Sequence, residues 1–276
     1  MKHLAFRLLP VALLAGVAAL SASTAQPDST DTEVRAIIDR ALERSAWAEE
    51  QAFEARYRHA MIQRARKFDK QGEVEEDEKR LYRVEPVRGV PYNRLVSKNG
   101  GPIEGDDLKT ERERWRDFLE YLAKDPDEDE DEDEDEEDEN IVFNDELLDR
   151  YTARLDGIRD LRGRPSYVIS FEPKPGKLPV RRQIDRALNK SRGELWIDQA
   201  TYEIARVHFE LIGRVRLWWG ILGNISDVTG HFEREPIADD VWLPTAVDIY
   251  FDVRVLFSTT RRSETTHRSD FELVAE

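Results

Sequence analysis

Apolar and polar residues alternate with a period of two through most of the C-terminal half of the chain. In GELWIDQATYEIARVHFEL, residues 193–211, the apolar Val207 and Phe209 flank the polar His208. Successive side chains of a strand point to opposite faces, so one face of this segment is apolar and the other is polar. The interruption at DQAT indicates a turn, and the segment therefore predicts a β-hairpin. The longest alternation has six apolar positions: Val247, Ile249, Phe251, Val253, Val255 and Phe257.

Two segments of the N-terminal half have a helical period instead. Thr30 and Glu33 have capping-box spacing ahead of an apolar stripe, which predicts a helix at the start of the mature chain. A second helix is predicted over residues 106–124, where Pro126 ends it. Its stripe consists of Leu108, Trp115, Phe118, Leu119 and Leu122. Asn144 is expected to cap a further short helix.

The segments between and after these helices read as strands. Phe53, Ala55, Tyr57 and Met61 share one face of an alternating segment, and further strands are predicted over 81–87 and 92–103. QGEVEEDEKR, residues 71–80, is expected to be a polar turn. Later strands are predicted in a hairpin through 160–163 and at the end, over 267–273, with a short helix near 180–188.

This order of elements predicts an α+β fold. About nine to eleven antiparallel strands, each with one apolar face, form a curved meander whose apolar side must be covered. The two long amphipathic helices are the available cover. We therefore expect a curved, half-open antiparallel β-barrel with helices covering its concave face.

The first 25 residues have the pattern of a secretory signal peptide. Basic residues precede an apolar stretch over 8–20, and small residues follow it up to Ala25. An uncleaved membrane anchor is the alternative reading. Residues 26–276 then form one domain, which contains a helical and acidic insert at about 106–143. Because the chain has no cysteine, it has neither a lipobox nor disulfides. We expect an exported, periplasmic and monomeric protein.

The net charge of −16 comes almost entirely from one segment. Without the 14 carboxylates of Asp125 and the run 127–139, the net charge would be −2. No basic stripe accompanies it, so a nucleic-acid partner is not expected. Adjacent like charges favour a disordered, solvated loop. The alternative is a functional electrostatic tether. Attraction for calcium or a basic partner would be diffuse, because a dedicated calcium loop requires spaced ligands and a glycine turn.

No catalytic or metal motif stands out in the sequence. There is no G-x-S-x-G, H-x-H or H-E-x-x-H, and the mature histidines occur singly at His59, His208, His231 and His267. We therefore expect no enzyme activity, no cofactor and no metal, although a glycosidase-like carboxylate pair stays open as an alternative. His208, on the polar face of its strand, is interpreted as a solvated side chain.

Several segments resemble one family of exported proteins. RLVSKNGGPI, LRGRPSYVISFEPK, GELWIDQATYEIARV and WLP are similar to LolA/LolB-like outer-membrane lipoprotein-sorting (carrier) proteins. GELWID followed by a turn and an alternating strand is the most specific of these elements. The resemblance implies an unclosed barrel plugged by helices, with a cavity for acyl chains. Residues 106–139 lie outside that carrier pattern, and no single arginine here aligns with the family's gating arginine.

The leading hypothesis is a carrier or sensor for a hydrophobic ligand such as lipid or lipoprotein acyl chains. A lipid site needs apolar area rather than a polar motif, since each buried CH₂ contributes about 0.8 kcal/mol. An acyl chain would displace the covering helices. The expected lining residues are Tyr57, Trp115, Leu119, Trp196, Phe209, Trp218 and Phe251. Core packing is the alternative for these aromatic residues. The alternative function is a non-enzymatic envelope interaction or regulatory protein that uses the same half-barrel without a ligand cycle.

Overall fold

The computed structural model describes residues 29–124, 144–217, 223–256 and 258–274. The helices are α1 (Ser29–Glu50), η1 (a 3₁₀ turn, Phe53–Arg56), α2 (Gly105–Tyr121), α4 (Asp145–Leu148) and α5 (Asp185–Leu188). The strands are β1 (Tyr57–Phe68), β2 (Val74–Val87), β3 (Val90–Lys98), β4 (Gly101–Pro102), β5 (Tyr151–Leu161), β6 (Arg164–Pro173), β7 (Ser191–Asp198), β8 (Ile204–Leu211), β9 (Val215–Leu217), β10 (Gly223–Ala238), β11 (Val241–Val255) and β12 (Ser258–Leu273). The predicted signal peptide, the acidic run, Trp218 and Phe257 lie outside the described residues.

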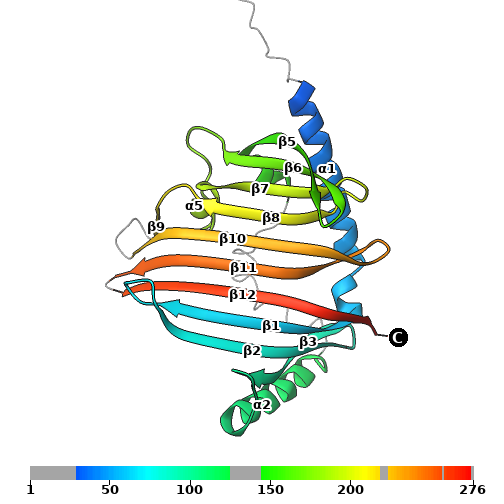
Figure 1. The fold of residues 1–276 in the computed structure, drawn as a ribbon, viewed down its shortest axis with the longest axis vertical. Helices are drawn as coiled ribbons and strands as arrows, with labels where there is room; N and C mark the ends of the chain where they lie inside the picture. The colour runs from blue at the N-terminus through cyan, green and yellow to red at the C-terminus, as the bar shows by residue number, and fades with distance from the viewer. Residues whose placement is uncertain (1–28, 125–143, 218–222, 257, 275–276) are drawn as a thin grey trace, which may run out of the picture.

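All the strands belong to one antiparallel, unclosed sheet of 12 strands (Figure 1). Its order is β4-β3-β2-β1-β12-β11-β10-β8-β7-β6-β5, with β9 paired to β10. The first strand, β1, pairs with the last, β12, so the two ends of the domain meet in the middle of the sheet. The α+β class and the open antiparallel sheet are confirmed, with one strand more than the upper end of the expected range.

The strand register defines two faces of the sheet, because opposite residues on neighbouring antiparallel strands point to the same side. One row of such partners crosses eight strands: Ile169, Leu195, Val207, Phe232, Val247, Thr266, Gln63 and Arg80. Helix α1 packs on the side of this row, where Val34, Ile37 and Ile38 form a buried cluster with Ile169 and Leu195. We call this side the α1 face.

An ion-pair cluster ties α1 to two strand ends. The Arg44 Nε donates to the Glu203 Oε2 at 2.8 Å, and the Arg234 Nη1 lies 2.5 Å from the Glu203 Oε1. Glu203 is fully buried in the β7–β8 turn, and Arg44 also donates to the backbone carbonyl of Asp240. Helix α1 is therefore held by buried apolar and charged contacts and is an integral part of the core.

Helix α2 packs at the other edge of the sheet and on the other side. Tyr92 of β3 pairs with Glu85, which lies five residues beyond Arg80 in β2 and so points away from the α1 face. The Tyr92 hydroxyl donates to the Glu111 Oε1 at 2.7 Å, and its ring lies 4.8 Å from the Trp115 ring. Figure 1 shows α2 beyond β3 at the edge far from β5. The two long helices therefore do not cover one face together.

Two sequence predictions differ from the structure. Residues 53–56, expected in a strand, form the turn η1, which follows Ala52 in the left-handed conformation at a φ of 46°. Residues 74–80, expected in a turn, belong to β2. Cross-strand ion pairs with β1, such as Arg64 with Asp77 and Lys67 with Glu76, compensate the charges of this segment. By contrast, Asn144 caps α4 as predicted, because its side chain accepts from the Leu147 N–H.

Candidate functional site

A contiguous set of apolar side chains occupies the α1 face at the centre of the sheet. The strands β8, β10 and β11 contribute Phe209, Val228, Phe232, Val247, Ile249, Phe251 and Val253, which the register places side by side. We call these seven residues the apolar platform. All of them are half-buried. Among the described residues, none of the seven belongs to or packs on a buried core cluster, whereas Val207, at their border, packs on the α1 cluster.

Two phenylalanines and a glycine set the shape of the platform. Gly230 pairs with Phe209, and a methyl group placed on Gly230 would lie 2.1 Å from a carbon of the Phe209 ring. The ring therefore lies across the glycine rather than standing upright. The rings of Phe209 and Phe232 are stacked, with centroids 6.0 Å apart and planes inclined by 15°. Together they present broad aromatic surface to whatever covers this face.

The platform ends sharply at β12. Ile249 and Phe251 stand opposite Glu264 and Arg262, whose side chains form an ion pair at 2.8 Å. The same face continues across β1 and β2 with polar residues such as Gln63 and Arg80. Beside the platform, the α1 face is therefore polar on β12, β1 and β2, whereas two residues further along β1 and β2 the same face carries the buried Met61 and Tyr82.

The opposite face of the same strands carries a charged cluster. The Arg206 Nε donates to the Glu233 Oε1 at 2.7 Å, Arg162 pairs with the same carboxylate, and the His231 Nε2 lies 3.0 Å from it. Burial, and then the charge of Arg206, lowers the pKa of His231. The imidazole is therefore neutral at neutral pH. Glu233 is shared among these neighbours, which stabilises the sheet electrostatically.

The structure distributes the predicted lining residues over several places. Phe209 and Phe251 both lie on the apolar platform, separated by β10. Trp196 pairs with Arg206 on the opposite face, where the Arg206 guanidinium lies 5.3 Å from its ring centroid. Tyr57 is buried in a small cluster at the end of α1.

Trp115 and Leu119 both belong to α2. The Arg94 guanidinium lies 4.5 Å from the Trp115 ring centroid, and Leu119 is exposed. Trp218 lies outside the described residues. Of the six predicted residues that the structure describes, Phe209 and Phe251 lie on the platform and the other four do not.

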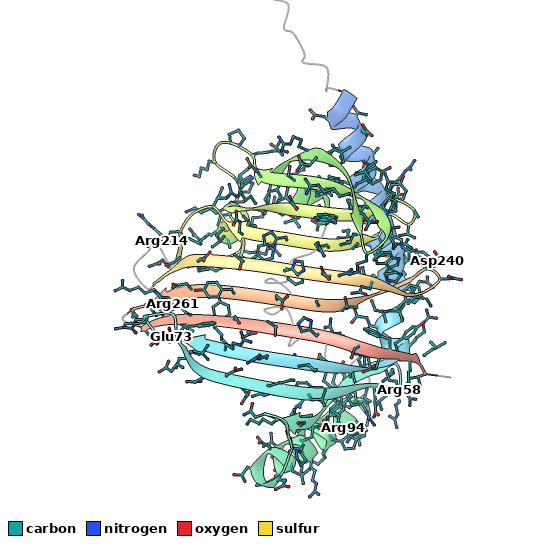
Figure 2. The ribbon with its side chains drawn as sticks, viewed as in Figure 1. Arg58, Glu73, Arg94, Arg214, Asp240 and Arg261 are labelled. Atoms are coloured by element: carbon teal, nitrogen blue, oxygen red, sulfur yellow. The ribbon has the colours of Figure 1, made fainter. Side chains whose placement is uncertain are left out.

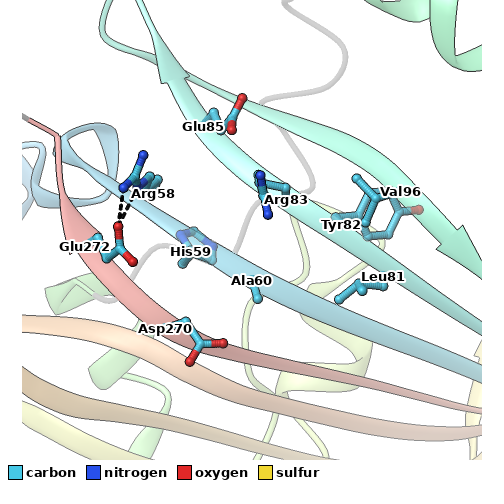
Figure 3. Close-up of a pocket in the computed structure, with 10 residues that line it drawn as sticks. All are labelled: Arg58, His59, Ala60, Leu81, Tyr82, Arg83, Glu85, Val96, Asp270 and Glu272. Carbon is cyan, nitrogen blue, oxygen red and sulfur yellow. Dashed lines mark hydrogen bonds and ion pairs between the residues drawn. The ribbon is translucent and has the colours of Figure 1, made fainter.

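A cavity of about 320 Å³ lies between β1, β2 and β12 (Figure 3). In its lining the Arg58 Nε donates to the Glu272 Oε2 at 2.7 Å, and Arg83 and Asp270 also line it. Burial, and then the charge of Arg268, lowers the pKa of the lining His59. Sequence reasoning missed this cavity because its residues are brought together only by the pairing of the first strand with the last. The lining therefore combines charged side chains of both signs with an imidazole whose pKa is lowered.

The described residues hold no group of three His, Asp or Glu side chains that could bind a metal ion. His208 is exposed, as expected for a solvated side chain. None of the described helices is long and apolar enough to cross a membrane.

The chain matches no family model and no curated protein. Solved structures of low similarity include a LolA superfamily protein from Nitrosomonas europaea, with 13% identity, a TM-score of 0.30 and coverage of 88% of this chain and 94% of that one. A lipoprotein-sorting protein domain from Vibrio parahaemolyticus has 11% identity, a TM-score of 0.26 and coverage of 86% and 93%. The MucA/MucB complex of Pseudomonas aeruginosa has 12% identity, a TM-score of 0.20 and coverage of 85% and 100%. The family that the sequence resembles therefore recurs among similar structures, at values too low to assign a function.

Proposed function

We propose that this chain is an exported, periplasmic carrier or sensor that binds a hydrophobic ligand, lipid or lipoprotein acyl chains, on the apolar platform. The observation that carries the proposal is the platform itself: seven contiguous apolar side chains, half-buried, on a face that α1 covers only further along. Contiguous apolar surface of this kind marks binding sites in soluble proteins.

The energetics fit an acyl ligand. Each CH₂ removed from water contributes about 0.8 kcal/mol, so a long chain needs no specific polar contact to bind. The flat Phe209 and Phe232 rings offer broad contact for such a chain. The charged border at Glu264 and Arg262 confines an apolar ligand to β8, β10 and β11.

The buried contacts of α1 argue against a mechanism in which the acyl chain displaces this helix. A helix held by the Arg44–Glu203–Arg234 cluster is a poor lid, because its removal would leave Glu203 buried without its α1 partner. Helix α2 packs on the other face. An acyl chain therefore binds beside α1 on the part of the face that neither described long helix covers, and displacement of these two helices is not required.

The alternative function is a non-enzymatic envelope interaction or regulatory protein that uses the same sheet. The charged residues bordering the platform favour it, since they can pair with the polar side of an amphipathic helix laid on the platform. An acyl chain has no polar group that could pair with Glu264 or Arg262.

The test is a titration with a fluorescent fatty acid such as cis-parinaric acid, comparing two neighbouring substitutions in β11. Phe251→Ser removes an aromatic ring from the platform, whereas Tyr250→Ser removes one from the opposite face. Losing a buried aromatic contact worth about 1.5 kcal/mol or more weakens binding roughly tenfold. The proposal predicts this loss for Phe251→Ser alone. Equal affinity of both variants, or no binding by the unaltered chain, would contradict it.

A further inference from the structure

A second cavity, of about 620 Å³, lies at one end of the sheet. It is lined by residues of α5, β9 and the connection after β6. Figure 2 labels Arg214 at this end, opposite the end that carries Asp240. The lining holds six cationic side chains: Lys174, Lys177, Arg186, Lys190, Arg214 and Arg216. Among the residues that the structure describes, none that lines the cavity is acidic. In a protein with a net charge of −16, a cavity lined by one sign of charge is an unusual concentration of positive potential.

The carboxylates nearby in the chain do not neutralise these cations. Asp185, next to Arg186 in α5, is fully buried, and Arg150 approaches one of its oxygens to 3.1 Å. The other oxygen of Asp185 accepts from the backbone N–H of Arg181 and of Arg182. The side chain of Glu146 pairs with Arg181 at 3.1 Å. Both carboxylates are thus engaged by arginines that do not line the cavity.

The Nε of Arg186 gives an independent sign of a missing acceptor. It is buried and has no hydrogen-bond partner among the described residues. A buried donor without an acceptor is unfavourable, and more so when the donor is charged. A ligand oxygen that reached this guanidinium would supply such an acceptor. Arginine guanidinium groups match the oxygens of a phosphate group in geometry as well as in charge.

Apolar side chains connect this cavity to the platform. Val215 of β9 lines the cavity and is almost fully buried, and it pairs with Ile225 of β10. Ile225 in turn stands opposite Val253 of the platform. Leu178 and Val180 complete an apolar wall beside the cations. The cavity can therefore hold a phosphate group alone or one attached to an apolar chain.

We propose that this cavity, which we call the basic cavity, is a binding site for a phosphate-bearing anion. The site does not depend on acyl binding by the platform. If the anion is the phosphate of a lipid headgroup, the cavity and the platform bind two parts of one ligand. If the anion is a small phosphate compound, the cavity is a separate site.

Calorimetric titration of the full chain at low salt tests the site, with sodium pyrophosphate as the probe. The substitution pair Lys177→Gln/Arg216→Gln removes two exposed cations from the lining, which leaves the buried core intact. The matched pair Lys109→Gln/Arg112→Gln removes the same charge from exposed positions on α2. Each lost charge-assisted contact is worth about 1.5 kcal/mol, so we expect pyrophosphate affinity to fall at least about tenfold in the first pair. The α2 pair is expected to keep it.

Two further ligands identify the source of the phosphate. Lysophosphatidic acid, below its micelle concentration, is compared with a monoacylglycerol of the same chain length. If lysophosphatidic acid binds more tightly than pyrophosphate and loses affinity in both Phe251→Ser and the cavity pair, the anion is a lipid headgroup. Equal affinity for both phosphate ligands identifies a small-molecule anion site. Monoacylglycerol binding tests the platform alone, so either proposal can fail without the other.

The inference is overturned by two results. One is an absence of binding by both phosphate ligands to the unaltered chain. The other is an equal loss of affinity in the cavity pair and the α2 pair, because that would reflect net charge rather than a site. A melting temperature measured for each variant confirms that it is folded, and Arg186→Gln gives a second test of the buried donor.

Discussion

The substitution Gly230→Ala tests the geometry of the apolar platform most sharply. The added methyl group would lie 2.1 Å and 2.3 Å from two carbons of the Phe209 ring, far inside van der Waals contact. The ring must therefore lift from the sheet and lose its stacking on Phe232. Overpacking of this kind costs about 1–3 kcal/mol of folding free energy. For a domain of this size, that loss lowers the melting temperature by roughly 2–4 °C per kcal/mol.

A double-mutant cycle identifies the cause of that loss. In a Phe209→Ala background the ring is absent, so Gly230→Ala should have little effect or should stabilise the strand. Gly213→Ala is the control, since a methyl group there meets no atom within 4 Å. Thermal unfolding of the unaltered chain, the two single variants and the double variant gives the coupling free energy, and the control is measured beside them. If Gly230→Ala is as costly without the Phe209 ring as with it, the flat-ring geometry is refuted.

Three further predictions concern the elements around the platform. Glu203→Gln removes the charge between Arg44 and Arg234, and chemical denaturation should show a loss of about 3 kcal/mol; a change near zero would contradict the integral role of α1. Burial, and then Glu111, raises the pKa of Tyr92 to about 12, so its contribution to stability is present below pH 10 and disappears as the pH rises through 12. The difference in stability between the unaltered chain and Tyr92→Phe should shrink over that window, and a constant difference would refute it. Trp115→Ala should lower the melting temperature, because it removes the packing of α2 on Tyr92, but it should leave fatty-acid affinity unchanged. Weaker fatty-acid binding would place α2 at the site.

The alternation of apolar residues predicted the later strands well, because it is a local signal. The run from Val247 to Phe257 was expected as one long strand. Its positions up to Val255 lie in β11 (Val241–Val255), and Phe257 lies outside the described residues. The strand at 74–80 could not be found in this way. Charges occupy both of its faces, and their partners, such as Arg64 and Lys67, come from a neighbouring strand. Stabilisation of that kind depends on register, which the pattern of one segment does not contain.

The candidate site was predicted only in part for the same reason. Aromatic content pointed to the C-terminal sheet, and Phe209 and Phe251 do lie on one surface. Trp196 lies on the other face, because Gly193, three residues before it, is the partner of Phe209. The basic cavity gave no signal in the sequence, since its cations come from three separated segments. Only the fold brings them together.

The central claim is that the apolar platform holds a hydrophobic ligand. Native mass spectrometry of the protein purified from a lipid-producing bacterial host tests it most directly. The account predicts co-purified lipid on the unaltered chain and on Tyr250→Ser, and a marked loss of that lipid on Phe251→Ser. A ligand-free mass for the unaltered chain, together with no response to fatty-acid probes, would contradict it and favour the interaction protein.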